Sequence, residues 1–237
     1  MALEETYPGL EAAALEGAAA ALLGSLPAAH RALLGASDGL SILAGSYRLF
    51  GVANPALPDL LSWNAPETWR FAWAGRADPY LCFGASALGD PYAYRLADLG
   101  RAGEGSEPPV VELYAVTLDP IDEHPSFAAF FAATFLDEPD TVHHARIRRE
   151  RAKAGRFPLD RFLVYAPSPL LVGGRTDVQR LVSLPAAQAM IVYGDIATQI
   201  GDRDDLAGLR ELTPYTDEAG RERIRLDWDP EAVARPE

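Results

Sequence analysis

The chain has 237 residues, of which 49% are hydrophobic and 23% charged, a composition typical of a globular protein and not of a disordered one. Its 34 acidic and 21 basic side chains give a formal charge of −13 at pH 7, which disfavours nucleic acid and anionic lipid and favours basic partners. The single cysteine excludes an intrachain disulfide, and no run of about twenty apolar residues could span a bilayer. We therefore expect a cytoplasmic protein. The charge has a second interpretation, which is that it only keeps the protein in solution.

The first fifty residues are predicted to form two helices followed by extended chain. Apolar side chains recur at helical spacing over residues 10–23 and again over residues 28–36. The pair Asp38-Gly39 is a strong turn signal. After this turn, residues 40–52 have the composition of extended chain.

An antiparallel sheet is predicted for the next part of the chain. Aromatic and β-branched residues gather in four runs, at residues 69–73, 80–83, 92–96 and 110–118. Such residues are enriched in strands, and the Gly89-Asp90-Pro91 triplet predicts a turn between the second and third runs. Tyr92 and Tyr94 alternate, so they should lie on one face of the sheet.

A helix with a phenylalanine stripe should follow the sheet. Ser126 can accept hydrogen bonds from the free amide groups of a first helical turn. Four phenylalanines then recur at helical spacing, namely Phe127, Phe130, Phe131 and Phe135. We interpret this stripe as core.

The last third of the chain alternates strands and helices. We expect a polar helix over residues 140–154, a strand over 162–165, an amphipathic helix over 186–200, and a closing hairpin from residues 212–215 and 224–228. The predicted fold class is α+β, with an antiparallel β-sheet flanked by helices and a smaller α+β C-terminal extension. The predicted organisation is a first domain over residues 1–140, a basic connecting helix over 141–156, and an extension over 157–237 that packs on the first domain.

Motifs of nucleotide, nucleophile and cofactor chemistry are absent from the sequence. The segment 84–88 lacks the second glycine of a nucleophile elbow, and Gly173-Gly174 lacks the lysine of a phosphate-binding loop. Cys82 lies in an apolar strand, which favours an inert buried thiol. We therefore predict no catalytic residue, no cofactor and no enzymatic activity.

Metal binding is the one chemical alternative that the sequence raises. His143 and His144 follow a group of acidic residues, with His124 further upstream. However, adjacent residues on a helix point about 100° apart, whereas a helical zinc site spaces its histidines four apart. We therefore predict no metal site.

A basic run occupies the predicted connecting helix. It consists of Arg146, Arg148, Arg149, Arg151, Lys153 and Arg156. Because no aromatic residues alternate with it, we interpret it as a solvated face, or as a clamp onto neighbouring acidic segments, and not as a nucleic-acid site.

The first 136 residues resemble the SUKH superfamily in the order of their motifs. The matching segments are residues 26–34, 37–40, 49–51, 83–84, 89–94 and 110–116, followed by the phenylalanine helix. Residues 165–174 and the helix that ends at Gln199 resemble the C-terminal domain of type VI secretion immunity proteins.

These resemblances imply an immunity protein that binds and neutralises a cognate toxin, often a nuclease, and carries no catalytic residues. An acidic inhibitor could occupy the basic surface that a nuclease needs for its substrate. The acidic residues proposed for contact with such a basic toxin domain are Glu123, Asp137, Glu138 and Asp140. Two alternatives stay open: a regulatory interaction scaffold with a cellular partner, and a metal-dependent enzyme using the region of His143 and His144.

Overall fold

The protein is an α+β structure built on one antiparallel sheet, as the sequence predicts. The computed structural model describes residues 5–10, 18–52, 54, 57–101, 107–136, 158–172, 180–201, 203, 206 and 208–229. Seven strands of the sheet follow each other in chain order. They are β1 (Glu5–Thr6), β2 (Leu40–Ile42), β3 (Tyr47–Leu49), β4 (Tyr80–Ser86), β5 (Pro91–Arg95), β6 (Val110–Leu113) and β7 (Pro120–His124).

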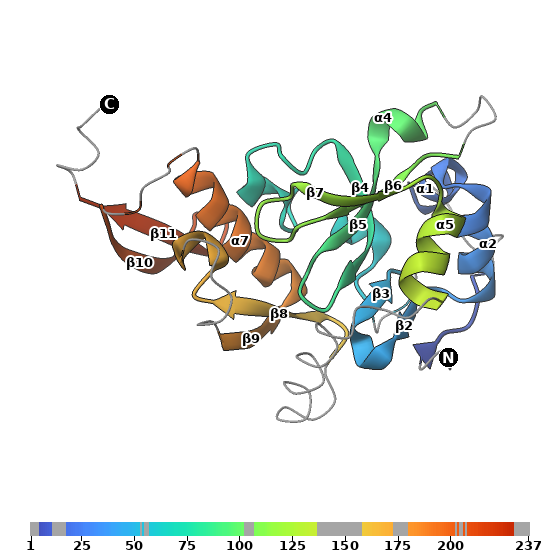
Figure 1. The fold of residues 1–237 in the computed structure, drawn as a ribbon, viewed down its shortest axis with the longest axis horizontal. Coiled ribbons are helices and arrows are strands. Elements are labelled where there is room, and N and C mark those ends of the chain that lie inside the picture. The colour runs from blue at the N-terminus through green and yellow to red at the C-terminus, as the bar shows by residue number, and fades with distance from the viewer. Residues whose placement is uncertain are drawn as a thin grey trace.

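Helices cover both faces of this sheet. Figure 1 shows α2 and α5 on one side of the sheet and α7 on the other. The helical elements of the N-terminal part are α1 (Ala18–Ser25), α2 (Ala28–Ala36), η2 (Leu43–Gly45), α3 (Leu60–Trp63), η3 (Arg70–Trp73), α4 (Leu96–Leu99), α5 (Phe127–Phe131) and the π-helical turn η5 (Ala132–Leu136). Two connections are long: α1 and α2 lie between β1 and β2, and α3 and η3 lie between β3 and β4.

The C-terminal part consists of two hairpins and one long helix. Its elements are β8 (Arg161–Ala166), η6 (Pro169–Val172), β9 (Arg180–Pro185), α7 (Ala186–Ile200), β10 (Leu209–Thr216) and β11 (Glu222–Trp228). β8 pairs with β9, and β10 pairs with β11. This part packs on the sheet, because Phe162 and Met190 belong to the same buried cluster as the aromatic residues of the strands. The predicted connecting helix over residues 141–156 lies outside the described residues.

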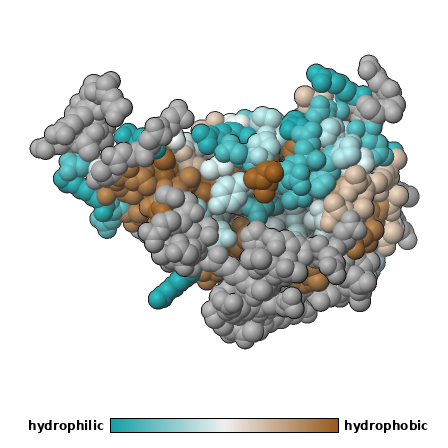
Figure 2. All heavy atoms as spheres, viewed as in Figure 1, coloured by the Kyte–Doolittle hydropathy of each residue, from teal (hydrophilic) through white to brown (hydrophobic). Residues whose placement is uncertain are grey.

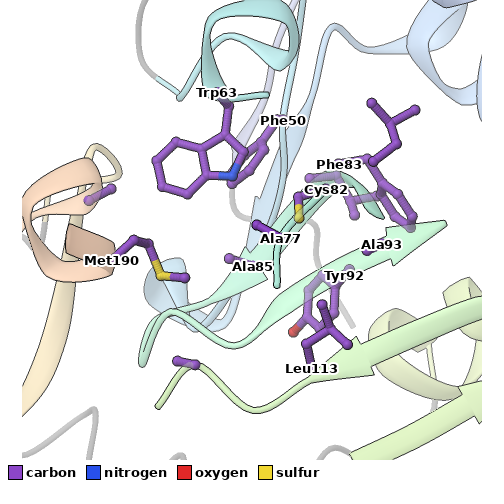
Figure 3. Close-up of a cluster of buried hydrophobic side chains, with 14 of the residues drawn as sticks. Phe50, Trp63, Ala77, Cys82, Phe83, Ala85, Tyr92, Ala93, Leu113 and Met190 are labelled. Carbon is purple, nitrogen blue, oxygen red and sulfur yellow. The ribbon is translucent and has the colours of Figure 1, made fainter. Parts of the chain in front are cut away.

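The core is aromatic, and the stripe of phenylalanines contributes to it as predicted. Tyr92 and Tyr94 share one face of the sheet, where the ring of Tyr92 lies 4.9 Å from that of Phe130. The Tyr94 hydroxyl lies 3.1 Å from Nδ1 of the buried His30. Figure 3 shows this interior from Trp63 across the sheet to Tyr92. Ser126 caps α5 by accepting a hydrogen bond from the amide of Ala129.

Two sequence-based expectations are corrected by the structure, and two strands were not predicted. Residues 70–73 form not a strand but the 3-10 helix η3, and Trp69 before it and Trp73 at its end are both fully buried in the core. The strand expected over residues 110–118 ends at Leu113 and turns back into β7, which was not predicted. Strand β9 was likewise not predicted.

A buried arginine joins the sheet to the C-terminal part. Arg48 in β3 donates hydrogen bonds from Nε to the Gly45 carbonyl at 2.9 Å and from Nη1 to the Leu159 carbonyl at 2.8 Å. It also donates to the carbonyl of Arg161 at the start of β8. Burial removes water from the Arg48 guanidinium and lowers its pKa to about 9. The surrounding carbonyl groups accept the hydrogen bonds that water would otherwise accept. This side chain fixes where β8 begins.

A second tight contact between the two parts lies at Gly194 of α7. A Cβ atom at this position would lie 2.8 Å from Nε1 and 2.9 Å from Cδ1 of Trp73. Trp73 cannot move aside easily, because its Nε1 donates a hydrogen bond to the Met190 carbonyl at 3.0 Å. Thr198 adds a second link by donating to the Ala72 carbonyl at 3.0 Å.

We expect Gly194→Ala to destabilise the protein even though alanine favours a helix. Overpacking against Trp73 should lower the free energy of unfolding by about 1–3 kcal/mol in urea denaturation. Gly24→Ala is the matched control, since a Cβ atom there would meet nothing within 4 Å. That variant should be neutral or up to about 1 kcal/mol more stable. Equal effects of the two variants would contradict the tight contact at Gly194.

A second prediction concerns His30 and acid. Burial lowers the pKa of His30 to about 3, because the interior disfavours the charged imidazolium. The unfolded chain therefore binds a proton between about pH 6.5 and 3 that the folded chain does not, and stability falls as the pH falls through that window. In His30→Leu, the loss of stability between pH 7.5 and 4.5 should be smaller than in the wild type by about 2–3 kcal/mol. Denaturant curves at the two pH values measure this difference, and identical pH dependence would refute it.

Candidate functional site

An apolar groove lies between the two C-terminal hairpins. Its volume is about 590 Å³, and it is lined by β8 and β9 on one side, by β10 and β11 on the other, and by α7 beneath. We call it the C-terminal groove. Its apolar lining includes Val182, Leu184, Val192, Ile196, Leu212 and Tyr215.

The groove follows from the periodicity of the elements that form it. In α7, Gln188, Val192 and Ile196 are spaced four apart and so share one face of the helix. In β9 and in β10, lining residues two apart share one face of each strand, as Val182 does with Leu184. The opposite face of α7, which carries Met190 and Ala197, packs against η3 and belongs to the main core. One helix therefore contributes to both the core and the groove.

Several apolar side chains that line the groove are partly exposed to solvent. Val182 is 41% exposed, and Leu212 and Tyr215 are each 39% exposed. These three are half of the six large hydrophobic residues that are exposed in the described part of the chain. Figure 2 shows hydrophobic atoms gathered on the side of the molecule that carries the C-terminal hairpins. A clustered apolar surface of this kind is typical of a binding site, whereas isolated exposed residues are not.

Polar side chains also line the groove, among them Gln188, Glu222 and Arg223. The hydroxyl of Tyr193 accepts a hydrogen bond from the amide of Tyr165 at 3.0 Å, and burial raises the pKa of Tyr193 well above its ordinary value. Ser168 lines the groove and is 4% exposed, and its Oγ has no hydrogen-bond partner among the described residues. A bound group that offers an acceptor or a donor could therefore satisfy this hydroxyl.

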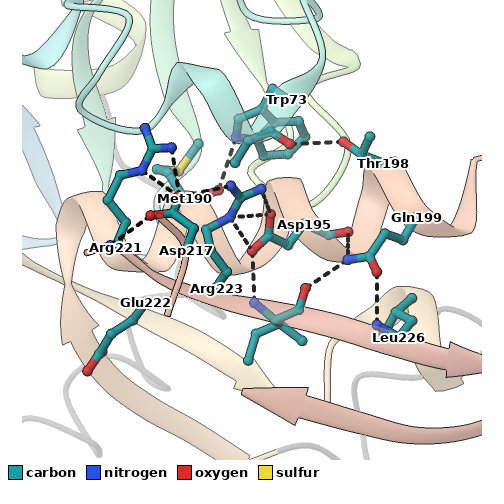
Figure 4. A network of polar contacts seen from close by, with 12 residues as sticks. Trp73, Met190, Asp195, Thr198, Gln199, Asp217, Arg221, Glu222, Arg223 and Leu226 are labelled. Carbon is teal, nitrogen blue, oxygen red and sulfur yellow. Dashed lines mark hydrogen bonds and ion pairs between the residues drawn. The ribbon is translucent and has the colours of Figure 1, made fainter. Parts of the chain in front are cut away.

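A polar network fastens the β10–β11 wall to α7. Asp195 is 2% exposed, and both oxygens of its carboxylate accept hydrogen bonds from Arg223. The carboxylate also accepts a hydrogen bond from the amide of Ile224 at 2.9 Å. Gln199 accepts from the amide of Leu226 at 2.9 Å and donates to the Ile224 carbonyl at 2.8 Å. Figure 4 shows these side chains of α7 facing the edge of β11.

In this network, side chains of α7 make the hydrogen bonds to β11 that a neighbouring strand would otherwise make. The backbone groups on the outer edge of β11 pair with Asp195 and Gln199, which are four residues apart on α7. The hydrogen bond from Arg223 to Asp195 also raises the pKa of Arg223, so this guanidinium stays charged. The amide of Ile224 thus points away from its β10 partner Pro214, which suits a proline that has no amide to donate.

The acidic residues predicted for partner contact are not in the groove. Glu123 lies in β7 of the sheet, where its side chain is 49% exposed and accepts a hydrogen bond from Arg95 at 2.7 Å. The other three predicted contacts, Asp137, Glu138 and Asp140, lie outside the described residues. His143 and His144 also lie outside them.

Cys82 occupies the buried position that the sequence predicts. It lies in β4 and is 1% exposed, and burial raises the pKa of its thiol to about 12. The thiol is therefore protonated at neutral pH, and it is a poor nucleophile.

Comparison with known proteins gives no relative for this chain. No protein-family model, curated protein or solved structure matches the sequence or the fold. Among the described helices, none is both long and apolar enough to cross a membrane.

We expect the C-terminal groove to bind an uncharged, polarity-sensitive dye such as Nile red, because the net charge would repel an anionic dye. Leu212→Asp should reduce the fluorescence of the bound dye severalfold by placing a charge in the apolar lining. Ile121→Asp is the matched control, since Ile121 is 57% exposed but lies on β7 outside the groove. Equal dye binding by the two variants would show that the groove is not the apolar site.

Proposed function

We propose that this chain is a binding protein that acts by direct contact with a protein partner, and that the C-terminal groove receives an apolar anchor of that partner. The observation that carries the proposal is the convergence of Val182, Leu212 and Tyr215, all partly exposed, on one groove. Interfaces draw most of their affinity from a few aromatic and aliphatic side chains seated in such hollows.

The groove is held in place by contacts within the chain before any partner binds. Its floor, α7, is tied to η3 through Trp73, and its β11 wall is tied to α7 through Asp195 and Gln199. Walls that are already ordered lose little conformational entropy when a partner binds. The groove can therefore convert buried apolar area into affinity efficiently.

The charge of the chain supports a basic partner. At −13, the protein attracts a basic surface from a distance and raises the rate of encounter, while the groove supplies the short-range contact. Glu123 offers one acid on the sheet edge, and Asp137, Glu138 and Asp140 stay predicted contacts of the same kind.

We assign the partner to the class of basic toxin domains, such as nucleases, and the chain to the immunity proteins of the SUKH superfamily. The support for this assignment is the order of motifs in the first 136 residues together with the α+β fold and its antiparallel sheet. The regulatory scaffold is the competing function, and the same experiment separates the two.

The test is binding of the purified chain to the purified product of a toxin gene adjacent to its own. We expect a tight complex that abolishes toxin activity and whose association rate falls as salt is raised. The double variant Leu212→Asp/Tyr215→Ala should weaken binding by about 30-fold or more, as loss of an interface anchor does. Ile121→Asp should bind within about twofold of the wild type.

Two outcomes would contradict the proposal in different ways. Unchanged toxin binding by the groove variant would move the interface away from the groove. Failure of the wild type to bind or inhibit the toxin, with a single defined cellular protein bound in its place through the groove, would establish the scaffold. Circular dichroism of each variant ensures that a loss of binding is not a loss of folding.

A further inference from the structure

Three side chains with metal-ligating atoms meet on the edge of the sheet, far from the C-terminal groove. They are Glu112 of β6 with Asp122 and His124 of β7. Nε2 of His124 lies 3.1 Å from Oε1 of Glu112 and 3.7 Å from Oδ2 of Asp122. One ligand atom of each residue lies within 4.8 Å of the other two.

Strand register brings these residues together. Glu112 pairs directly with Asp122 across β6 and β7, and His124 follows Asp122 by two positions, so all three share one face. The same face carries Thr134 and Phe130 from the helical segment that covers it.

The pairing of Glu112 with Asp122 is unfavourable on its own. Two carboxylates directly opposite each other on neighbouring strands repel and destabilise the sheet. A divalent cation held between these side chains would offset the repulsion between the two carboxylates.

Outer contacts hold all three side chains toward one point. The hydroxyl of Thr134 lies 3.3 Å from Oε1 of Glu112, and Oδ1 of Asp122 accepts the amide of Glu123 at 2.8 Å. This second contact leaves Oδ2 of Asp122 directed at His124. The ring of His124 packs edge-on against Phe130 at 5.5 Å. Such supporting contacts orient the ligands of metal sites.

We propose that Glu112, Asp122 and His124 bind a divalent transition-metal ion of the zinc class. A tetrahedral zinc ion holds its nitrogen and oxygen ligands about 3.3–3.5 Å apart, and the observed separations of 3.1 and 3.7 Å bracket that value. The imidazole selects against Mg²⁺ and Ca²⁺, which prefer oxygen ligands alone.

The remaining coordination positions of this ion face solvent. Asp122 is 64% exposed, so the ion would keep one or more waters or accept a donor group from a partner. The proposal does not depend on the function assigned to the C-terminal groove, and its tests need no protein partner.

The experiment measures Zn²⁺ binding to the full chain after any affinity tag has been removed and bound metal stripped. We expect one ion per chain by calorimetry, and Co²⁺ in its place should give the visible absorption of a low-symmetry nitrogen and oxygen site. Asp122→Asn should weaken Zn²⁺ binding by about tenfold or more, as loss of one ligand does.

The matched control is Glu123→Gln. This change removes the same charge from the neighbouring residue, which lies on the opposite face of β7. We expect it to bind Zn²⁺ within about twofold of the wild type. Equal weakening by both variants would show nonspecific attraction to an acidic surface and would overturn the proposal.

A melting experiment supplies an independent measurement. Zn²⁺ should raise the melting temperature of the wild type and of Glu123→Gln, because it binds the folded chain, and should leave that of Asp122→Asn almost unchanged. Absence of both calorimetric binding and a melting shift in the wild type would equally overturn the proposal.

Discussion

The arrangement of the molecule depends on the contact between Trp73 and helix α7. Gly194 leaves room for the indole, and the Met190 carbonyl accepts its hydrogen bond, so the helix lies directly against η3. Because the other face of α7 forms the floor of the C-terminal groove, this one contact sets where the groove lies relative to the sheet. Arg48 fixes the start of β8 in the same way, so both walls of the groove take their position from the core.

The polar residues of α7 stabilise the hairpin of β10 and β11. A lone hairpin is marginally stable, since each strand has an unpaired edge. Asp195 and Gln199 pair with the edge of β11, and Ile196 meets Leu226 in a small apolar cluster. These contacts hold the hairpin against α7, and Leu212 and Ile224, on the same strand face as Leu226, line the groove.

Much of the fold could be predicted from local signals in the sequence. Features that depend on contacts between distant residues could not. The cap at Ser126 and the closing hairpin were predicted because their evidence lies within a few residues. Strand β7 was missed because its polar residues show no apolar alternation. The C-terminal groove joins residues from 164 to 224, and no local pattern marks their meeting. For the metal site, the spacing of Asp122 and His124 was a usable signal, but only strand register reveals Glu112 opposite them.

Pro214 has a consequence for how the protein behaves at high concentration. Its partner Ile224 directs its amide toward α7, so the nitrogen of Pro214 lies on the side of β10 away from β11. A third strand arriving at that side would find no donor at this position and could not complete a regular ladder. Leu212 and Tyr215 of β10 can therefore stay exposed to solvent, because the free edge of the same strand is a poor template for amyloid-like stacking.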